Sequence, residues 1–199
     1  MSSIIKVDTI QNQSGANIIS ESSNTITLGA SGDTITVPSG ATLNVNSSAT
    51  LSGALTNTPA FIAYKTANQT IATATDAKIT FEAEQLDTNS GYDTSLSRFT
   101  PGVAGYYWIG AYWRYATSTN FTNGQWLLYK NGAVLNNVTQ SNDDNEANNY
   151  NYITYASATD YFEMYGYQNS GINVTVNGSA SYQGSQVQSQ FYAFKLIGV

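Results

Sequence analysis

The most informative stretch of the chain lies between Tyr106 and Tyr115 and reads YYWIGAYWRY. In an extended strand, alternate side chains point to opposite faces. One face of this stretch then carries Tyr107, Ile109, Ala111, Trp113 and Tyr115, and the other carries Tyr106, Trp108, Gly110, Tyr112 and Arg114. Both faces are bulky and apolar, although the core of a β-sandwich covers only one face of a strand. We therefore expect a neighbouring subunit to cover the second face, with an interface formed by Tyr106, Trp108, Tyr112 and Arg114.

Further short apolar or alternating runs, typical of strands, surround this stretch. They lie at residues 61–64, 79–83, 126–129, 152–155, 161–167, 172–176 and 191–197. Gly, Pro, Asn and Ser separate the runs, and Asn131-Gly132 suits the positive φ angles of a type I′ hairpin turn. No segment shows a sustained apolar stripe with the 3.6-residue period of a helix. These patterns predict an all-β sandwich, jelly roll or barrel over residues 59–199.

The aromatic residues mark a boundary in the chain. All 15 Tyr, 7 Phe and 3 Trp lie at or beyond Phe61. The residues before Phe61 repeat a Thr-rich alternating pattern every eight or nine residues, as TITL at 25–28, TITV at 34–37 and TLNV at 42–45. One such repeat is a strand and a turn, which buries little apolar surface within a single chain. We predict that residues 16–58 form an intertwined trimeric β-repeat stalk; the alternative is a flexible tether.

Composition excludes several classes of function. Charged residues make up 10% of the chain, the formal net charge is −6 and the sequence pI is about 4.3. An acidic chain with so few cations lacks the surface that binds nucleic acid or an anionic membrane. The absence of Cys and His excludes disulfides, thiolate nucleophiles, imidazole bases and the usual zinc, copper and haem ligand sets. No apolar run approaches a membrane span or a signal-peptide core, so we expect neither membrane insertion nor a signal peptide.

Residues 79–112 contain the landmarks of a known domain family in the family's order. They are Phe81, Asn89, Tyr92-Asp93, Arg98-Phe99-Thr100 and Gly105-Tyr106-Tyr107, followed by the hairpin at 127–134 and the closing strand at 191–197. This arrangement resembles the C1q and tumour-necrosis-factor-like jelly roll, with Ala193 where Gly is usual. The resemblance covers about residues 60–199. It implies a jelly-roll head, residues 59–199, that assembles as a homotrimer after a trimeric fibrous stalk.

The first residues of the chain resemble a different group of proteins. The leader IIKVDTIQ at residues 4–11, followed by repeats rich in Gly, Ser, Thr and Val, resembles the start of fibre and appendage proteins of tailed bacteriophages. This resemblance implies that residues 1–15 attach the chain to other virion proteins. It also implies a location in the virion, on the tail or the capsid, after synthesis in the host cytoplasm.

The segment from Leu135 to Ala158 is rich in Asn and matches no landmark of the jelly roll. Its acidic cluster of Asp143, Asp144 and Glu146 offers hard oxygen ligands that suit Ca²⁺, although the spacing is not that of an EF-hand. The alternative for this cluster is a solvated loop tip. Tyr and Asn are common in recognition surfaces, so we expect exposed receptor contacts in this segment. The candidates are Asn142, Asn145, Asn148, Asn149 and Tyr150.

These patterns together predict a homotrimeric structural and adhesive fibre protein of a tailed-phage particle. Its head contacts a host-surface glycan or protein by binding, not by turnover, and three sites on one stem gain avidity. Glu82 and Glu84 share a strand face, as a glycosidase pair might, but neither has a partner that the sequence can place. We therefore predict no catalytic residue and no cofactor. The alternatives are a capsid decoration fibre, a bacterial C1q-like lectin and a glycan depolymerase.

Overall fold

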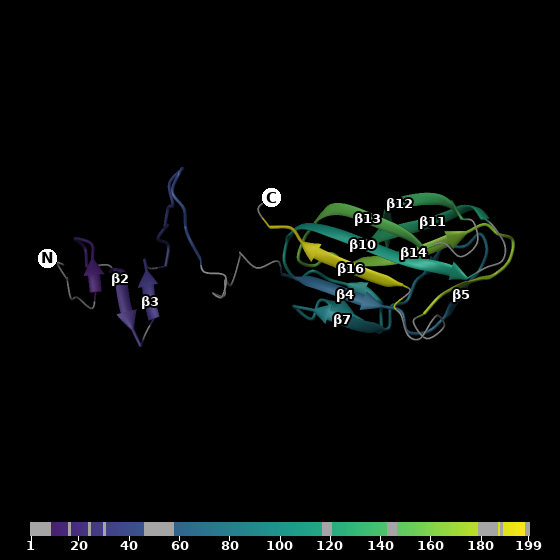
Figure 1. Ribbon diagram of the computed structural model, residues 1–199, viewed down its shortest axis with the longest axis horizontal. Coiled ribbons are helices and arrows are strands. Elements are labelled where there is room, and N and C mark those ends of the chain that lie inside the picture. The colour runs from purple at the N-terminus through teal and green to yellow at the C-terminus, as the bar shows by residue number, and fades with distance from the viewer. Residues whose placement is uncertain are drawn as a thin grey trace. The chain divides into compact units, whose positions relative to one another are not determined.

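The computed structural model describes residues 9–15, 17–23, 25–29, 31–45, 58–116, 121–142, 147–178, 187 and 189–197. The chain divides into two compact units, Met1–Thr50 and Leu51–Val199, and each is described by itself. Within the described ranges every regular element is a β-strand (Figure 1). None of these ranges contains a helix long and apolar enough to cross a membrane. The prediction of an all-β chain is therefore confirmed for the described residues.

The first unit contains one small antiparallel sheet in the order β1-β2-β3. Its strands are β1 Thr9–Gln11, β2 Asn17–Ser22 and β3 Thr25–Leu28. A tight turn joins β2 to β3, with Ser23 at a φ of 49°, and Ile19 then lies opposite Leu28. The first of the three Thr-rich repeats is therefore a strand, as its alternation predicts.

The two later repeats do not form strands in the single chain. Residues 33–38 and 41–45 belong to no sheet of the described residues. Between the two repeats, the main-chain N–H of Ala41 donates to the carbonyl oxygen of Pro38 at 3.0 Å and closes a turn. A strand needs a neighbouring strand to take up its hydrogen bonds. Within the part of the chain that the structure describes, neither repeat has such a neighbour, and Ile35, Leu43 and Val45 are 39–70% exposed.

The second unit is a sandwich of two sheets. The first sheet has the order β5-β15-β10-β16-β4-β7, with β13 also paired to β10. Its strands are β4 Ala60–Tyr64, β5 Gln69–Ile71, β7 Ala83–Asp87, β10 Gly105–Ala116, β13 Ala147–Ala156, β15 Val174–Val176 and β16 Gln190–Lys195. In Figure 1, β13, β10, β16 and β4 run side by side in this layer.

The second sheet has the order β12-β11-β14-β9-β8, with β6 paired to β14. Its strands are β6 Ala77–Lys78, β8 Tyr92–Asp93, β9 Arg98–Phe99, β11 Phe121–Lys130, β12 Ala133–Asn142 and β14 Phe162–Gln168. Three of these strands are only two residues long. Along the chain, strands of the second sheet are interspersed with strands of the first. This is the connectivity of a two-layer jelly-roll sandwich.

The inward face of β10 forms the centre of the core between the sheets. Its fully buried side chains are Tyr107, Ile109, Ala111, Trp113 and Tyr115, as the alternation predicts. Rings from the two sheets stack across the core, with centroids 4.4 Å apart for Phe61 and Phe99 and 5.3 Å apart for Trp113 and Trp126. Each large apolar side chain buried in this way contributes about 1.5–3 kcal/mol. These rings therefore hold the two sheets together.

The apolar run at residues 79–83 is not a single strand, although its composition predicts one. The main-chain N–H of Ile79 donates to the carbonyl oxygen of Met164 on β14, at 2.9 Å. Four residues later, Ala83 pairs with Tyr64 on β4, in the other sheet. The run is buried at Ile79 and Phe81 because the chain crosses between the two sheets there.

Three ion pairs lie in and around the crossing segment. Lys65 is fully buried, and its Nζ donates to Glu82 Oε1 at 2.9 Å. Glu163 on β14 is also buried, and its Oε1 accepts hydrogen bonds from Lys78 Nζ and Arg98 Nε, each at 2.8 Å. Burial by itself raises the pKa of Glu163, but the hydrogen bonds and charges of Lys78 and Arg98 outweigh it and hold that pKa below its usual value.

We predict that Glu163→Gln lowers the free energy of unfolding by about 1–3 kcal/mol at neutral pH, because two cations lose their carboxylate. The loss is smaller than for a fully buried pair, since the side chains of Lys78 and Arg98 are 27% and 32% exposed. A folded pKa below the ordinary value of 4.5 stabilises the protein above that pH, and the benefit disappears as the pH falls through the folded pKa.

Urea unfolding of the variant and the native chain near pH 7 and near pH 3 measures both effects. The matched control is Glu84→Gln, which changes an exposed carboxylate on β7. Equal unfolding midpoints for the two variants near pH 7 would contradict the role given to Glu163.

Candidate interaction surface

The outward side of the first sheet carries the interface residues predicted on β10. Tyr106 and Trp108 are 46% and 45% exposed, and Tyr112 and Arg114 are half-buried. On the neighbouring strand β13, Tyr155 lies opposite Tyr106 and Ile153 lies opposite Trp108. These two side chains are 52% and 58% exposed. The structure therefore places all four predicted interface residues on one face, and β13 extends that face.

The same face continues across β16, β4 and β7. In the strand register Phe194 lies opposite Trp108, and Tyr192 lies opposite Gly110. Ile62 on β4 lies opposite Tyr192, and Leu86 on β7 lies opposite Ile62. We call this surface the aromatic face; it comprises Ile62, Leu86, Tyr106, Trp108, Tyr112, Arg114, Ile153, Tyr155, Tyr192 and Phe194. It spans five adjacent strands, which is larger than the scattered apolar residues that ordinary protein surfaces expose.

Asn151 on β13 fixes the rings at the centre of the aromatic face. Its Oδ1 accepts hydrogen bonds from Trp108 Nε1 at 3.0 Å and from the Tyr192 hydroxyl at 2.9 Å. Gly110 lies beside the Tyr192 ring and the Asn151 amide. A Cβ added at this position would lie 2.5 Å from the ring and 2.6 Å from Asn151 Oδ1. Burial raises the pKa of Tyr192, so its hydroxyl remains a donor at neutral pH. The rings are therefore held in one arrangement before any partner binds.

The side-chain alternation of β13 and β16 indicates which further residues share a strand face. Ile153 and Tyr155 share a strand face with Asn151, and Tyr192 and Phe194 share a strand face. Only the register of β13 and β16 against β10 shows that these residues lie around Trp108. Local sequence does not determine such long-range pairing.

The four asparagines predicted as receptor contacts in the Asn-rich segment fall into three groups. Asn149 on β13 is exposed, as expected. Asn142 and Asn148 lie within β12 and β13. Asn145 and the acidic residues Asp143, Asp144 and Glu146 lie outside the described residues, so the calcium site stays a prediction. Among the residues that are described, no group of three or more acidic side chains is placed to hold a metal ion.

The expectation that Tyr150 is exposed is wrong. Its side chain is fully buried in the core, and its hydroxyl donates to Asn136 Oδ1 at 3.0 Å. The reason is the alternation of β13, in which Tyr150 faces inward while its neighbours Asn149 and Asn151 face outward. Tyr150 therefore contributes to the core and not to a receptor contact.

Glu82 and Glu84 do not lie on one strand, because β7 begins at Ala83 and Glu82 precedes it. Burial alone raises the pKa of Glu82, but hydrogen bonds from Thr80 and Lys65 outweigh it and hold that pKa below the usual value. A lowered pKa does not suit the protonated acid of a glycosidase, which must donate a proton at neutral pH. Glu82 is instead an ion-pair partner of the buried Lys65.

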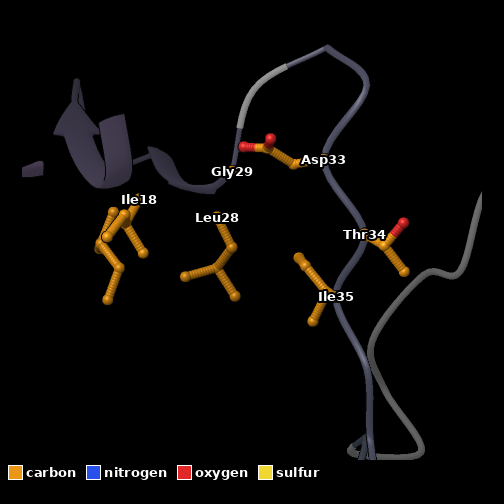
Figure 2. A pocket seen from close by; sticks show the side chains of 7 residues that line it. Ile18, Leu28, Gly29, Asp33, Thr34 and Ile35 are labelled. Carbon is orange, nitrogen blue, oxygen red and sulfur yellow. The ribbon is translucent and has the colours of Figure 1, made fainter. Parts of the chain in front are cut away.

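A second apolar surface lies in the first unit. Figure 2 shows Ile18, Leu28 and Ile35 turned toward one hollow, with Asp33 at its edge beside Gly29. The hollow has a volume of about 380 Å³. These apolar side chains are 47%, 53% and 62% exposed, so the single chain does not fill the space between them.

The comparisons with known proteins define the fold of the second unit. No family model matches the chain, and no curated protein matches its sequence. Among solved structures, Eiger TNF from S. frugiperda is 12% identical, with a TM-score of 0.51 over 70% of this chain and 93% of that one. Murine APRIL is 8% identical, with a TM-score of 0.51 over 69% and 98% of the two chains.

The globular domain of zebrafish complement 1qA protein is 14% identical over 69% of this chain and 96% of that chain, with a TM-score of 0.45. At the low identities of the two TNF-like structures, the likeness shows the fold alone. The second unit therefore has the jelly-roll fold of TNF-like domains, and the resemblance inferred from its sequence is confirmed at the level of the fold.

We predict that Gly110→Ala lowers the free energy of unfolding by about 1–3 kcal/mol, because the added methyl group displaces the Tyr192 ring and the Asn151 amide. Thermal unfolding followed by circular dichroism measures the change. Asn149→Ala, two residues from Asn151 on the exposed side of β13, is the control. A melting temperature for Gly110→Ala equal to that of the control would show that the centre of the aromatic face is loosely packed.

Proposed function

We propose that the chain is a homotrimeric structural and adhesive fibre protein of a tailed-phage particle. One observation carries the proposal: a continuous surface across five strands of the head is largely aromatic and apolar, and four of its side chains are 45–58% exposed in the single chain. An apolar surface of this extent on a folded domain is characteristic of a protein–protein interface.

A second copy of the chain is the partner that best suits the aromatic face. Most of its residues are uncharged, so identical copies approach one another without repulsion despite the net charge of −6. Large fixed rings such as Trp108 and Tyr106 are the residues that anchor protein interfaces. The trimeric state is supported by the resemblance of residues 60–199 to C1q and TNF-like domains, whose family trait is homotrimeric assembly.

The first unit supports the same assembly. Its described apolar side chains are exposed, including Ile26 and Leu43 at 70% each. The repeats at 34–37 and 42–45 have no strand partner within the described residues, which copies of the same repeats would supply. The proposal therefore retains a trimeric stalk over residues 16–58, with residues 1–15 attaching it to other virion proteins.

The proposed mechanism is adhesion to a host-surface glycan or protein. Three identical heads on one stem bind a repetitive surface with far higher avidity than one head does. The leader at residues 4–11 and the repeats behind it support a place in the virion, on the tail or the capsid.

We predict that the full chain has a solution mass three times its chain mass of 21.4 kDa, and that Ile153→Glu reduces the trimeric fraction. Burying an unpaired carboxylate at an interface costs several kcal/mol. Size-exclusion chromatography with light scattering at micromolar concentration measures the mass of each protein.

The matched control is Ile172→Glu, which places the same charge on a similarly exposed isoleucine outside the aromatic face. It should remain trimeric. A monomeric native chain, or equal masses for the two variants, would overturn the proposed interface.

A further inference from the structure

We propose that the outward face of the second sheet is a binding platform for a neutral polysaccharide. This inference rests on the proposed function in one respect: it takes the adhesive head to bind a glycan. It then places that binding on the sheet opposite the aromatic face, which assembly through the first sheet leaves open.

The strand register arranges this face in three rows across β12, β11 and β14. The rows are Thr139–Gln125–Tyr167, Asn137–Leu127–Tyr165 and Val134–Tyr129–Glu163. Leu127, at the centre, is only 4% exposed although it points away from the core, so the surrounding side chains close over it. The result is a surface of tyrosines and amides. We call these nine residues the tyrosine–amide platform.

Two of the three tyrosines of the platform, Tyr129 and Tyr165, are held in position by their contacts. The rings of Tyr129 and Tyr165 stack with their centroids 3.9 Å apart and their planes 27° apart. The Tyr129 hydroxyl also donates to Asp76 Oδ2 at 2.9 Å. Each ring uses one face on the other ring, and the negative second face of a ring can attract the weakly positive C–H groups on one side of a pyranose. Because these rings are already ordered, little conformational entropy is lost when a sugar stacks on them.

An ordered row of amides lies next to the rings. Gln125 Nε2 donates to Asn123 Oδ1 at 3.1 Å, and Gln125 Oε1 accepts from Asn137 Nδ2 at 3.3 Å. A side-chain amide has two N–H donors and an oxygen with two lone pairs, so each group has capacity beyond these bonds. Asn137 is exposed at the surface. Such groups can exchange paired hydrogen bonds with the hydroxyls of a sugar that stacks on the tyrosines.

The charges beside the platform favour a neutral ligand. Lys78 and Arg98 both contact the carboxylate of Glu163, and Asp76 accepts the hydrogen bond of Tyr129. The two cations and the two carboxylates balance, so an anionic or cationic ligand gains no net attraction there. Neutral hexose polymers match this surface better than uronic acids, nucleic acids or charged peptides.

Affinity electrophoresis of the full-length protein tests the platform. The probes are native gels that contain dextran, yeast mannan or arabinogalactan, with polygalacturonate as the anionic comparison. We expect at least one neutral polymer to retard the protein. Tyr165→Ala should weaken that binding about tenfold or more, because a stacking ring is lost.

Asn137→Ala changes an exposed amide and keeps the tyrosine stack, so it tests the platform even if Tyr165→Ala fails to fold. It should weaken binding about two- to fivefold, whereas the matched control Asn173→Ala, which changes an exposed amide outside the platform, should bind like the native chain. The platform is overturned if no neutral polymer retards the protein, if only polygalacturonate does, or if both platform variants bind normally.

The light-scattering mass of the same samples separates this inference from the proposed assembly. A trimer that no neutral polymer retards overturns the platform and leaves the assembly intact. A monomer whose retardation is lost in both platform variants overturns the assembly and leaves the platform intact.

Discussion

The structure depends on the two-sided apolar character of strand β10. A sandwich core can bury only one side of a strand, and here the buried side already contributes two tyrosines and a tryptophan to the centre of the molecule. The other side carries Trp108 and Tyr106 in solvent. Stability therefore comes from one side of β10, and the proposed need for a partner comes from the other.

We propose different functions for the two faces of the head. The first sheet presents fixed, uncharged rings organised around Asn151, which suits a permanent interface. The second sheet presents the tyrosine–amide platform, with balanced charges and hydrogen-bonding capacity, which suits reversible contact with a ligand. The buried ion pairs of Lys65 and Glu163 hold the short strands and the crossing segment between these two layers. In the proposed arrangement, assembly and adhesion use opposite sheets of one domain.

Local sequence predicts the features that depend on short-range periodicity. The alternation of β10 and the positive φ angles of Asn131 and Gly132, 54° and 81°, follow directly from residue type. The buried position of Tyr150 was missed because β13 begins within a segment whose composition resembles a loop. Two-residue strands such as β8 and β9, and the buried Lys65, leave no periodic signal at all. The aromatic face and the platform arise from strand register, which only long-range pairing determines.

The central claim is that the outward side of β10 is buried in the assembled protein. Hydroxyl-radical footprinting of the full chain, read by mass spectrometry, measures the reactivity of each aromatic side chain. If the assembled protein buries this side, Trp108 and Tyr155 react as slowly as the buried Trp113, although the single chain leaves them 45% and 52% exposed. Reaction rates for Trp108 and Tyr155 in proportion to that exposure would contradict it.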